Sequence, residues 1–250
     1  MKENKDNQYL MHADLGFDAL DFPGGQDGIV LLHGFTASPL EVKPLALALH
    51  EHGYTVSAPL LPGHGTHPDD LNKTHYTEWI ETAQEAIQAL KAKCQRVFIG
   101  GESMGGLIAL RIAELDLELA GVMIYAPALK AFHLWATPFA KYFVKYLAKS
   151  TDDNNLIWSG YGVYPLRAGH EMLKLQRITQ KELAKIAQPL LLVTTEKDTM
   201  VPQYVSQTIM NTIRSNQKEH LTLKESSHCI LIDMEKEAAV HKTLEFLSKI

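Results

Sequence analysis

Short apolar runs alternate with amphipathic segments along most of the chain. Runs typical of buried strands occupy residues 28–32, 54–58, 96–100, 120–126, 190–194 and 220–223. The segments between them repeat apolar residues three and four positions apart, as a helix requires, over residues 39–52, 77–93, 106–113, 203–213 and 235–249. This order predicts a mostly parallel sheet with helices on both faces, the α/β class.

The strongest chemical signal is the pentapeptide Gly101-Glu102-Ser103-Met104-Gly105, between one predicted strand and the next helix. It matches G-x-S-x-G, in which a sharp strand-to-helix turn exposes a nucleophilic serine. A serine hydroxyl is a weak nucleophile, so it needs an adjacent base and an exposed position. We expect a strained backbone at Ser103, with Gly101 and Gly105 placed where a Cβ would clash. The apolar strand and helix on either side argue against a chance match.

An acid and a base follow Ser103 in the order that this motif uses, with the acid first and the histidine last. Asp198 comes just after the strand 190–194, and His228 comes just after the strand 220–223. Ligands bind beyond the carboxyl ends of parallel strands. His228 would accept the Ser103 proton, and Asp198 would hold the imidazole tautomer. Activity is therefore expected to fall as the pH drops far enough to protonate His228.

Other acids and histidines fit these roles less well. Glu196 lies two residues before the predicted acid and could replace it, whereas Asp233 follows the predicted base. His64, His67 and His75 precede the serine, and lone histidines are more often loop or surface residues than ligands. A zinc site built on His64 and His67 would need further ligands at suitable spacing, and none is evident. We therefore expect no metal.

An oxyanion hole needs two backbone donors. The Met104 N–H lies at the start of the predicted helix, where unpaired amides favour negative charge. Phe35 follows the strand 28–32, where this arrangement supplies its second donor. We assign the Phe35 and Met104 N–H groups to the hole, and expect His33 to order the loop rather than to take part in the chemistry.

These motifs resemble the α/β-hydrolase fold carboxylesterases, above all the bacterial monoacylglycerol lipases. The matching segments are His33–Pro39, Gly63–His67, Trp79, Gly101–Gly106, Asp198 before Val201-Pro202, and Ser227-His228 before Asp233. The resemblance covers essentially the whole chain except the segment after Ala126. It implies hydrolysis of carboxylic esters without a cofactor, and it assigns the same triad and the same oxyanion amides.

Two positions depart from the family pattern. Glu102 stands where the lipases usually carry a small apolar residue or His, and it resembles the Gly-Glu-Ser elbow of other carboxylesterases. We expect it to be partly buried, hydrogen-bonded or raised in pKa, and structural rather than catalytic. A Glu102→Gln variant should then keep most of its activity. Cys229 replaces an apolar residue, and we expect a small buried hydrophobe there.

Residues 128–188 interrupt the alternation where this family inserts a cap. We expect a hydrolase core of residues 1–127 and 189–250 and a helical cap of residues 128–188. The cap holds nine of the twenty aromatic residues of the chain. Six of them fall on one helical stripe: Phe132, Trp135, Phe139, Tyr142, Phe143 and Tyr146. The stripe would either pack on the core, as in any amphipathic helix, or line an acyl-chain pocket through Trp135, Phe139, Tyr142 and Phe143.

Charge and composition narrow the class of protein. A net charge of −5 gives no reason to expect nucleic-acid binding, and two cysteines form no disulfide framework. The first seven residues are polar, and no stretch approaches the ~18 apolar residues of a membrane span, so we expect a cytoplasmic protein. The cap carries nine Lys or Arg against four Asp or Glu. A basic cap would bring the pocket mouth to anionic lipid surfaces.

Three functions compete on this evidence. The first is a serine ester hydrolase that acts on short- to medium-chain acyl esters, including monoacylglycerols. The second uses the same triad on a thioester or a hydroxycinnamate ester. The third is a non-catalytic protein that binds a small molecule, and the intact triad and oxyanion loop argue against it. The sequence leaves the substrate and the oligomeric state open.

Overall fold

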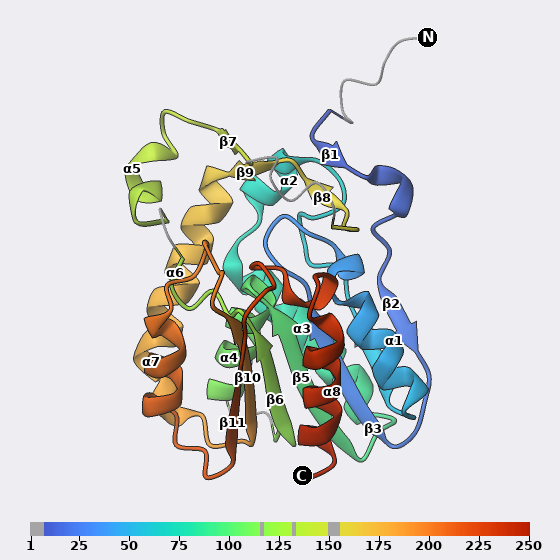
Figure 1. Ribbon diagram of the computed structural model, residues 1–250. Coiled ribbons are helices and arrows are strands. Elements are labelled where there is room, and N and C mark those ends of the chain that lie inside the picture. The colour runs from blue at the N-terminus through green and yellow to red at the C-terminus, as the bar shows by residue number, and fades with distance from the viewer. Residues whose placement is uncertain (1–7, 116–117, 132–133, 150–155) are drawn as a thin grey trace.

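The computed structural model describes residues 8–115, 118–131, 134–149 and 156–250, built around a seven-stranded sheet (Figure 1). The strands lie in the order β11 (Lys218–Leu223), β10 (Leu190–Thr195), β6 (Gly121–Tyr125), β5 (Arg96–Glu102), β3 (Asp27–Leu32), β4 (Thr55–Ala58) and β2 (Leu20–Phe22). Neighbouring strands are parallel except β2, which is antiparallel to β4. The predicted α/β class with a mostly parallel sheet is confirmed.

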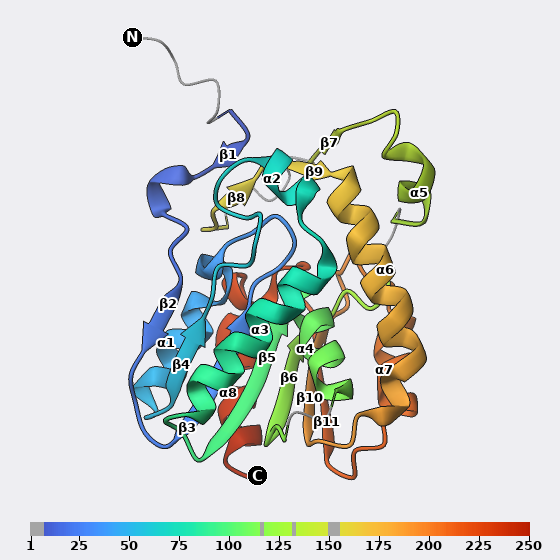
Figure 2. The same ribbon diagram turned by 180° about the vertical axis from the view of Figure 1, so that it is seen from behind.

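Helices cover both faces of this sheet. The helices α1 (Lys43–Glu51) and α8 (Lys236–Leu247) lie on the face toward the viewer in Figure 1. The opposite face, seen in Figure 2, carries α3 (Tyr76–Lys91), α4 (Met104–Glu114), α6 (Leu166–Glu182) and α7 (Tyr204–Thr212). Because side chains alternate along a strand, Ile29 and Leu31 pack in the core on the side of α1 and α8. Val30 and Leu32 pack in the core on the opposite side of the sheet. Both faces are buried, which explains the nearly continuous apolar runs.

The cap differs from the helical insertion expected from the sequence. After a 3₁₀ turn (Leu134–Ala136), the helix α5 spans only Thr137–Ala140, and β7 (Tyr146–Ala148), β8 (Gly160–Tyr161) and β9 (Val163–Pro165) follow. The predicted helical stripe is therefore wrong, because Tyr146 belongs to a strand that pairs with β9. After α5 the chain turns, with the Tyr142 N–H donating to the Phe139 carbonyl and the Val144 N–H to the Ala140 carbonyl, so the helix does not continue toward Tyr146. Phe132 lies outside the described residues.

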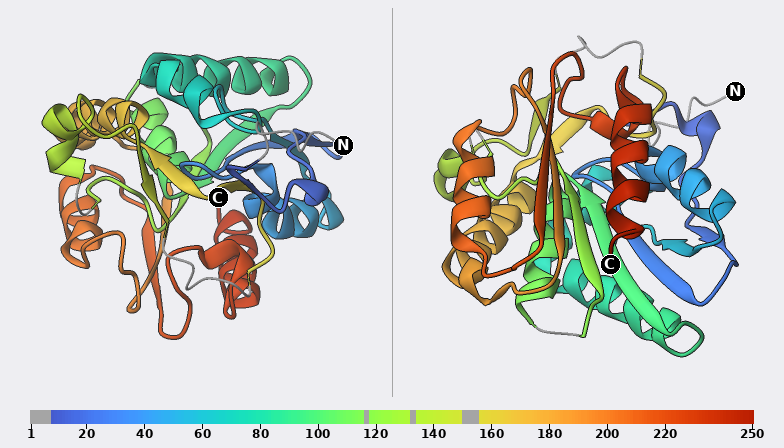
Figure 3. Two further views of the ribbon diagram at one scale, coloured as in Figure 1. Left: turned by 90° about the horizontal axis from the view of Figure 1, so that it is seen from above. Right: turned by 60° about the horizontal axis from the view of Figure 1, so that its bottom comes forward.

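Two of the cap segments are bound to distant parts of the chain. The strand β1 (Leu10–Met11) pairs antiparallel with β8, and the view from above shows the cap elements crossing the end of the sheet (Figure 3). The helix α2 (Pro68–Lys73) accepts hydrogen bonds through Asp69 from Lys145 and Tyr146. In contrast, α6 packs into the same hydrophobic core as α4, so the end of the insertion is part of the body.

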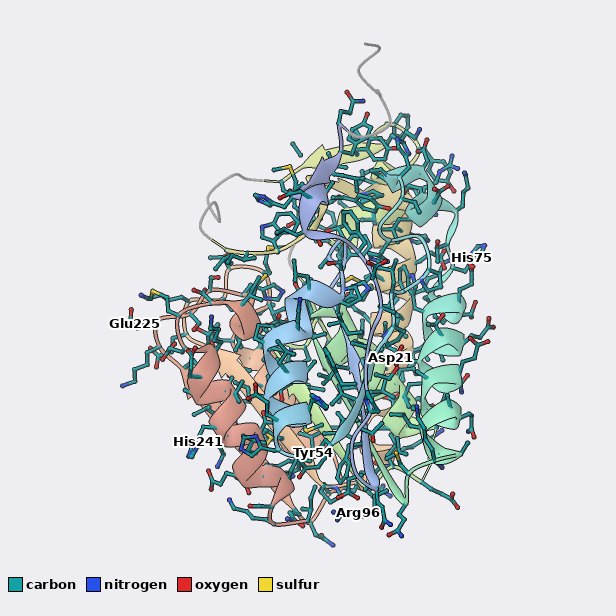
Figure 4. All side chains as sticks on the ribbon, turned by 90° about the vertical axis from the view of Figure 1, so that its right-hand side faces the viewer. Asp21, Tyr54, His75, Arg96, Glu225 and His241 are labelled. Carbon is teal, nitrogen blue, oxygen red and sulfur yellow. The ribbon has the colours of Figure 1, made fainter. Side chains whose placement is uncertain are left out.

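The other end of the sheet is fixed by charge. The Arg96 guanidinium donates to both carboxylate oxygens of Asp27, at 2.9 and 2.6 Å, and to the Ile250 carbonyl at 2.8 Å. Figure 4 shows Arg96 and Tyr54 at this end, far from the cap.

Among the described helices, none is both long enough and apolar enough to cross a lipid bilayer.

Gly105→Ala should destabilise the fold strongly. A Cβ at Gly105 would lie 2.0 Å from the Leu32 carbonyl oxygen, so α4 would have to move away from β3. We expect the free energy of unfolding to fall by about 2 kcal/mol or more. The matched control is Gly169→Ala in α6, where the nearest atoms lie at 3.4 and 3.5 Å and helix propensity favours alanine. Chemical denaturation of both variants checks the difference, and equal stabilities would contradict it.

Candidate active site

Ser103 lies on a strained turn between β5 and α4, as the motif predicts. Its φ of 53° and ψ of −110° fall outside the regions that ordinary residues occupy. The surrounding backbone holds this conformation: the Ser103 N–H donates to the Tyr125 carbonyl at 2.9 Å, and the Ser103 carbonyl accepts from Ala128 and Leu107. The serine hydroxyl is thereby presented at the carboxyl end of the sheet.

The two glycines of the turn are required by close backbone approach. A Cβ at Gly101 would lie 2.4 Å from the Gly105 carbonyl carbon, and one at Gly105 would meet Leu32 as described above. Real Cβ atoms essentially never come this close to other heavy atoms. The predicted clash at both positions is therefore confirmed.

The three residues predicted as a triad lie in hydrogen-bonding distance of one another. His228 Nε2 is 2.8 Å from Ser103 Oγ, and His228 Nδ1 is 2.9 Å from Asp198 Oδ2. The other carboxylate oxygen of Asp198 accepts from the backbone of Met200 and Val201. Since Asp198 accepts at Nδ1, the neutral imidazole carries its proton there and leaves Nε2 free to accept from the serine.

The loop that carries His228 is held by acidic side chains. One Glu235 carboxylate accepts the N–H groups of residues 224, 225 and 226, and Asp233 accepts both the N–H and the hydroxyl of Ser227. Asp233 thus anchors the loop at the residue before His228. Glu196, the rival acid, is exposed. Figure 4 shows Glu225 on the outer side of this loop.

The amides assigned to the oxyanion hole are not taken up by hydrogen bonds within the described part of the chain. In the loop His33–Ala37, the N–H groups of Gly34, Thr36 and Ala37 are all used, by Glu41, His64 and the Gly34 carbonyl. The Phe35 N–H has no hydrogen-bond partner among the residues that the structure describes. Met104 opens α4, so its N–H is one of the first four that a helix leaves without an internal partner.

Two buried histidines hold this loop in their neutral form. His33 Nδ1–H donates to the Gly34 carbonyl at 2.9 Å, while its Nε2 accepts from the Leu61 N–H at 3.0 Å. His64 Nε2 accepts from the Thr36 N–H at 3.1 Å, and its Nδ1–H faces the Leu61 carbonyl. Burial lowers the pKa of His33 to about 4 and that of His64 well below its usual range. The sequence indicated an ordering role for His33, but it did not single out His64 in this way.

The aromatic residues near the oxyanion loop are not the ones predicted. The Phe35 ring lies nearly parallel to that of Tyr164, at 6.5 Å between centroids, and edge-on to Trp79 at 6.4 Å. Tyr164 belongs to β9, so the cap covers this side of the site. In the sequence, the only indication of a role for Tyr164 was its position within the aromatic-rich residues 128–188.

The four aromatics expected to line an acyl pocket are on the surface instead. Trp135, Phe139, Tyr142 and Phe143 are between 73% and 88% exposed. They are not packed on the core, because α5 ends at Ala140 and the stripe does not continue along a helix. Tyr142 and Phe143 line a surface cavity of about 410 Å³, and a role of the four side chains in an acyl pocket stays a prediction.

Glu102 is fully buried, and its Oε1 accepts from the Leu231 N–H at 3.0 Å. Burial raises its pKa well above the ordinary range, which favours the neutral form. Cys229 is half-buried and carries a free thiol.

No group of three or more His, Cys, Asp or Glu suited to a metal ion occurs within the described residues.

Comparison with known proteins agrees with this geometry. A family model described as the alpha/beta hydrolase family matches residues 29–240. A thermostable monoacylglycerol lipase of Bacillus sp. (strain H-257) is 31% identical over 230 residues, which cover 90% of this chain and 92% of that protein. A carboxylesterase of Bacillus subtilis (strain 168) is 24% identical over 235 residues, 92% of this chain and 95% of that protein. A solved structure from work on two metagenome-derived lipolytic enzymes, LipS and LipT, has a TM-score of 0.89 at 29% identity and covers 94% of this chain and 98% of its own.

The neutral histidines should make stability depend on pH. Between the unfolded pKa of about 6.5 and the folded value of about 4 for His33, only the unfolded chain takes up the proton, so acidification favours unfolding. We expect His33 to contribute a slope of up to about 1.4 kcal/mol per pH unit in this window. Urea unfolding from pH 7 to 4 measures it. His33→Asn should flatten the slope, whereas replacing the exposed His241 (Figure 4) by Gln should not. Equal slopes in all three proteins would contradict the assignment.

Proposed function

Because the chain belongs to the α/β-hydrolase family, we propose that it hydrolyses carboxylic esters through an acyl-enzyme on Ser103. The observation that carries the proposal is the continuous line of hydrogen bonds from Ser103 Oγ through His228 to Asp198. The named relatives, a monoacylglycerol lipase and a carboxylesterase, support ester hydrolysis as the reaction class.

In the acylation step, Ser103 Oγ attacks the ester carbonyl carbon while His228 Nε2 takes the hydroxyl proton. The imidazolium is stabilised by Asp198, whose side chain is 6% exposed and therefore little screened by water. The carbonyl oxygen becomes an oxyanion and receives the Phe35 and Met104 N–H groups. Collapse of this intermediate returns the proton from Nε2 to the leaving alcohol.

Deacylation repeats these roles with water as the nucleophile. His228 accepts a proton from a water molecule, which attacks the acyl carbon, and then returns the proton to Ser103 as the acid leaves. Each residue therefore acts twice, and the proposed cycle uses no metal or cofactor.

The substrates we propose are short- to medium-chain acyl esters, including monoacylglycerols, by analogy with the relatives. A hydroxycinnamate ester is the second candidate, since the ring planes of Phe35 and Tyr164 are nearly parallel beside the oxyanion loop and an aromatic acyl group could pack against them. A thioester would use the same triad. The free thiols of Cys94 and Cys229 fit the cytoplasmic location that we propose.

A chain-length series tests the proposed function. The p-nitrophenyl esters from acetate to palmitate, with methyl ferulate added, are hydrolysed by the wild type and by Ser103→Ala. We expect a rate maximum at short to intermediate chains and a loss of at least about 10⁴-fold in kcat for the variant. Rates that are independent of both chain length and Ser103 would refute ester hydrolysis at this site. A preference for ferulate would select the second candidate.

We also propose that the cap touches anionic lipid surfaces while the substrate is taken up. Phe143 is 88% exposed, Phe139 77% and Trp135 76%, and aromatic side chains insert readily at the boundary of a bilayer. Exposed apolar residues gathered on one surface commonly mark an interaction site.

Cationic side chains accompany this apolar surface. A cavity of about 410 Å³ lies beside Tyr142 and Phe143, and its other lining residues include Lys73, Lys141 and Arg167. Lys141 also lies over the Tyr142 ring, at 5.2 Å from the centroid. The positive charge of this cavity fits the headgroups of anionic lipids, each basic residue near such a surface contributing about 1 kcal/mol.

Vesicle flotation tests the lipid contact. The wild type should float with vesicles that contain anionic lipid and much less with neutral vesicles. The double variant Trp135→Ser/Phe143→Ser and the single variant Lys141→Glu should both lose binding several-fold. The control is Leu47→Ser, which removes a side chain that is 38% exposed on α1, away from the cap. Equal flotation with both kinds of vesicle would remove the proposal and leave ester hydrolysis untouched.

A further inference from the structure

Two glutamates are buried beneath the proposed active site. Glu41 is 5% exposed and belongs to the 3₁₀ turn Pro39–Val42, and Glu102 is fully buried at the end of β5. Neither forms an ion pair with Lys or Arg within the described part of the chain. An unpaired carboxyl group in a protein interior costs free energy, so its presence calls for a compensating role.

Glu41 contacts both loops of the site. Its Oε2 accepts the Gly34 N–H at 2.5 Å. Its carboxyl group also accepts a hydrogen bond from the thiol of Cys229. Gly34 directly precedes Phe35, and Cys229 directly follows His228. One buried side chain therefore spans from the proposed oxyanion amide to the proposed general base.

The two carboxyl groups differ in the contacts that bear on their charge. Glu102 accepts the N–H groups of Ile230 and Leu231, and its Oε2 is buried without a hydrogen-bond partner among the described residues. Burial and the neighbouring Glu41 raise the pKa of Glu102 well above its usual range. Burial also raises the pKa of Glu41, but the Gly34 N–H and the field of His228 act in the opposite direction. Glu41 therefore has the contacts that favour a charged carboxylate, whereas Glu102 leaves one oxygen without a partner among the described residues.

We propose that Glu41 is a positioning residue, whose carboxylate joins the oxyanion loop to the His228 loop and presents His228 with a second negative charge besides Asp198. This rests on the proposed function, since it assumes that His228 becomes positively charged during the reaction. By fixing Gly34, Glu41 fixes the direction of the Phe35 N–H.

Other charged and titratable groups also act on this position. Lys149 comes from the cap and Asp198 from the loop after β10; His64, kept neutral, belongs to the loop after β4. At His228, the positive charge of Lys149 weakens the effect of a negative charge on Glu41, and the negative charge of Asp198 acts in the same direction as that on Glu41. None of them takes over the contact with Gly34, so the span between the two loops belongs to Glu41.

Glu41→Gln and Glu41→Asp separate the two roles. Gln keeps the reach to Gly34 and removes the charge, whereas Asp keeps the charge and loses the reach. Both are assayed on the best p-nitrophenyl ester for kcat, KM and the acid limb of kcat/KM. For Gln we expect the acid limb to move to lower pH by roughly half a unit, because removing a nearby anion disfavours the imidazolium. For Glu41→Asp we expect the acid limb to stay at its wild-type pH. We expect kcat to be about tenfold lower than in the wild type, or lower still, and KM to stay within about threefold, because a misplaced oxyanion donor weakens binding of the transition state rather than of the substrate.

Two further variants serve as references. Glu114→Gln changes a glutamate buried on α4 that pairs with Arg111, away from the site, and should leave both kcat and the acid limb unchanged. Glu102→Gln should leave the acid limb in place, because the raised pKa of Glu102 favours its neutral form. Thermal unfolding of every variant shows whether it is folded under the assay conditions.

The outcomes distinguish the inference from the proposed function. An acid limb that is unmoved in Glu41→Gln, or one that moves only in Glu102→Gln, overturns the assigned charge. Wild-type kcat in Glu41→Asp overturns the positioning role. If Gln fails to fold, the Asp variant still tests whether reach to Gly34 sets kcat. If the wild type shows no Ser103-dependent ester hydrolysis, the proposed function fails first, which the Ser103→Ala comparison reveals before any Glu41 variant is assayed.

Discussion

The close approach of α4 to β3 is the constraint on which the rest of the site depends. A left-handed backbone at a non-glycine residue costs of the order of 1–3 kcal/mol. At Ser103 it is imposed by the hydrogen bond that Ser103 donates to Tyr125 and by those that it accepts from Ala128 and Leu107. Those bonds form only if the helix starts directly against the strands, which Gly105 permits. The position of the Ser103 hydroxyl and that of the Met104 amide both result from this single packing arrangement.

The second half of the site is organised by a loop whose polar groups are satisfied by buried side chains. The carbonyl that accepts from His33 and the N–H of Phe35 belong to the same peptide unit, which lies between Gly34 and Phe35. A hydrogen bond accepted at one end of a peptide strengthens the donor at the other. His33 therefore orients the oxyanion amide and also polarises it. Because the protein supplies these dipoles before substrate arrives, they need not reorganise during the reaction.

The sequence predicts the body of this fold well, because its strands are buried on both faces and its helices have regular apolar spacing. Each predicted strand from β3 to β11 lies within about two residues of its observed position. The turn at Ser103 was predictable for a similar reason, since local geometry demands two glycines. The positions of Asp198 and His228 followed from the order of the strands. The close contact of all three side chains is a property of the structure alone.

The cap was harder to predict, because its structure depends on contacts with distant residues. The strand β8 pairs with β1, about 150 residues earlier in the chain, and the short helix α5 ends at Ala140 in a turn. Glu41 shows the same limitation within the body. In the sequence it is one more polar residue in a predicted helix, and its importance arises only where Gly34 and Cys229 meet it.

The attachment of the oxyanion loop to the rim of the molecule has a consequence for how activity would be lost. The Tyr161 N–H donates to the Thr36 carbonyl at 2.8 Å, and Tyr161 lies on β8, which among the described residues pairs with the two-residue strand β1. A two-stranded ribbon of this size opens at far lower free energy than the seven-stranded sheet beneath it. Heat would therefore inactivate the protein in two stages, the first a local opening at the rim that cooling reverses, the second the cooperative melting of the sheet.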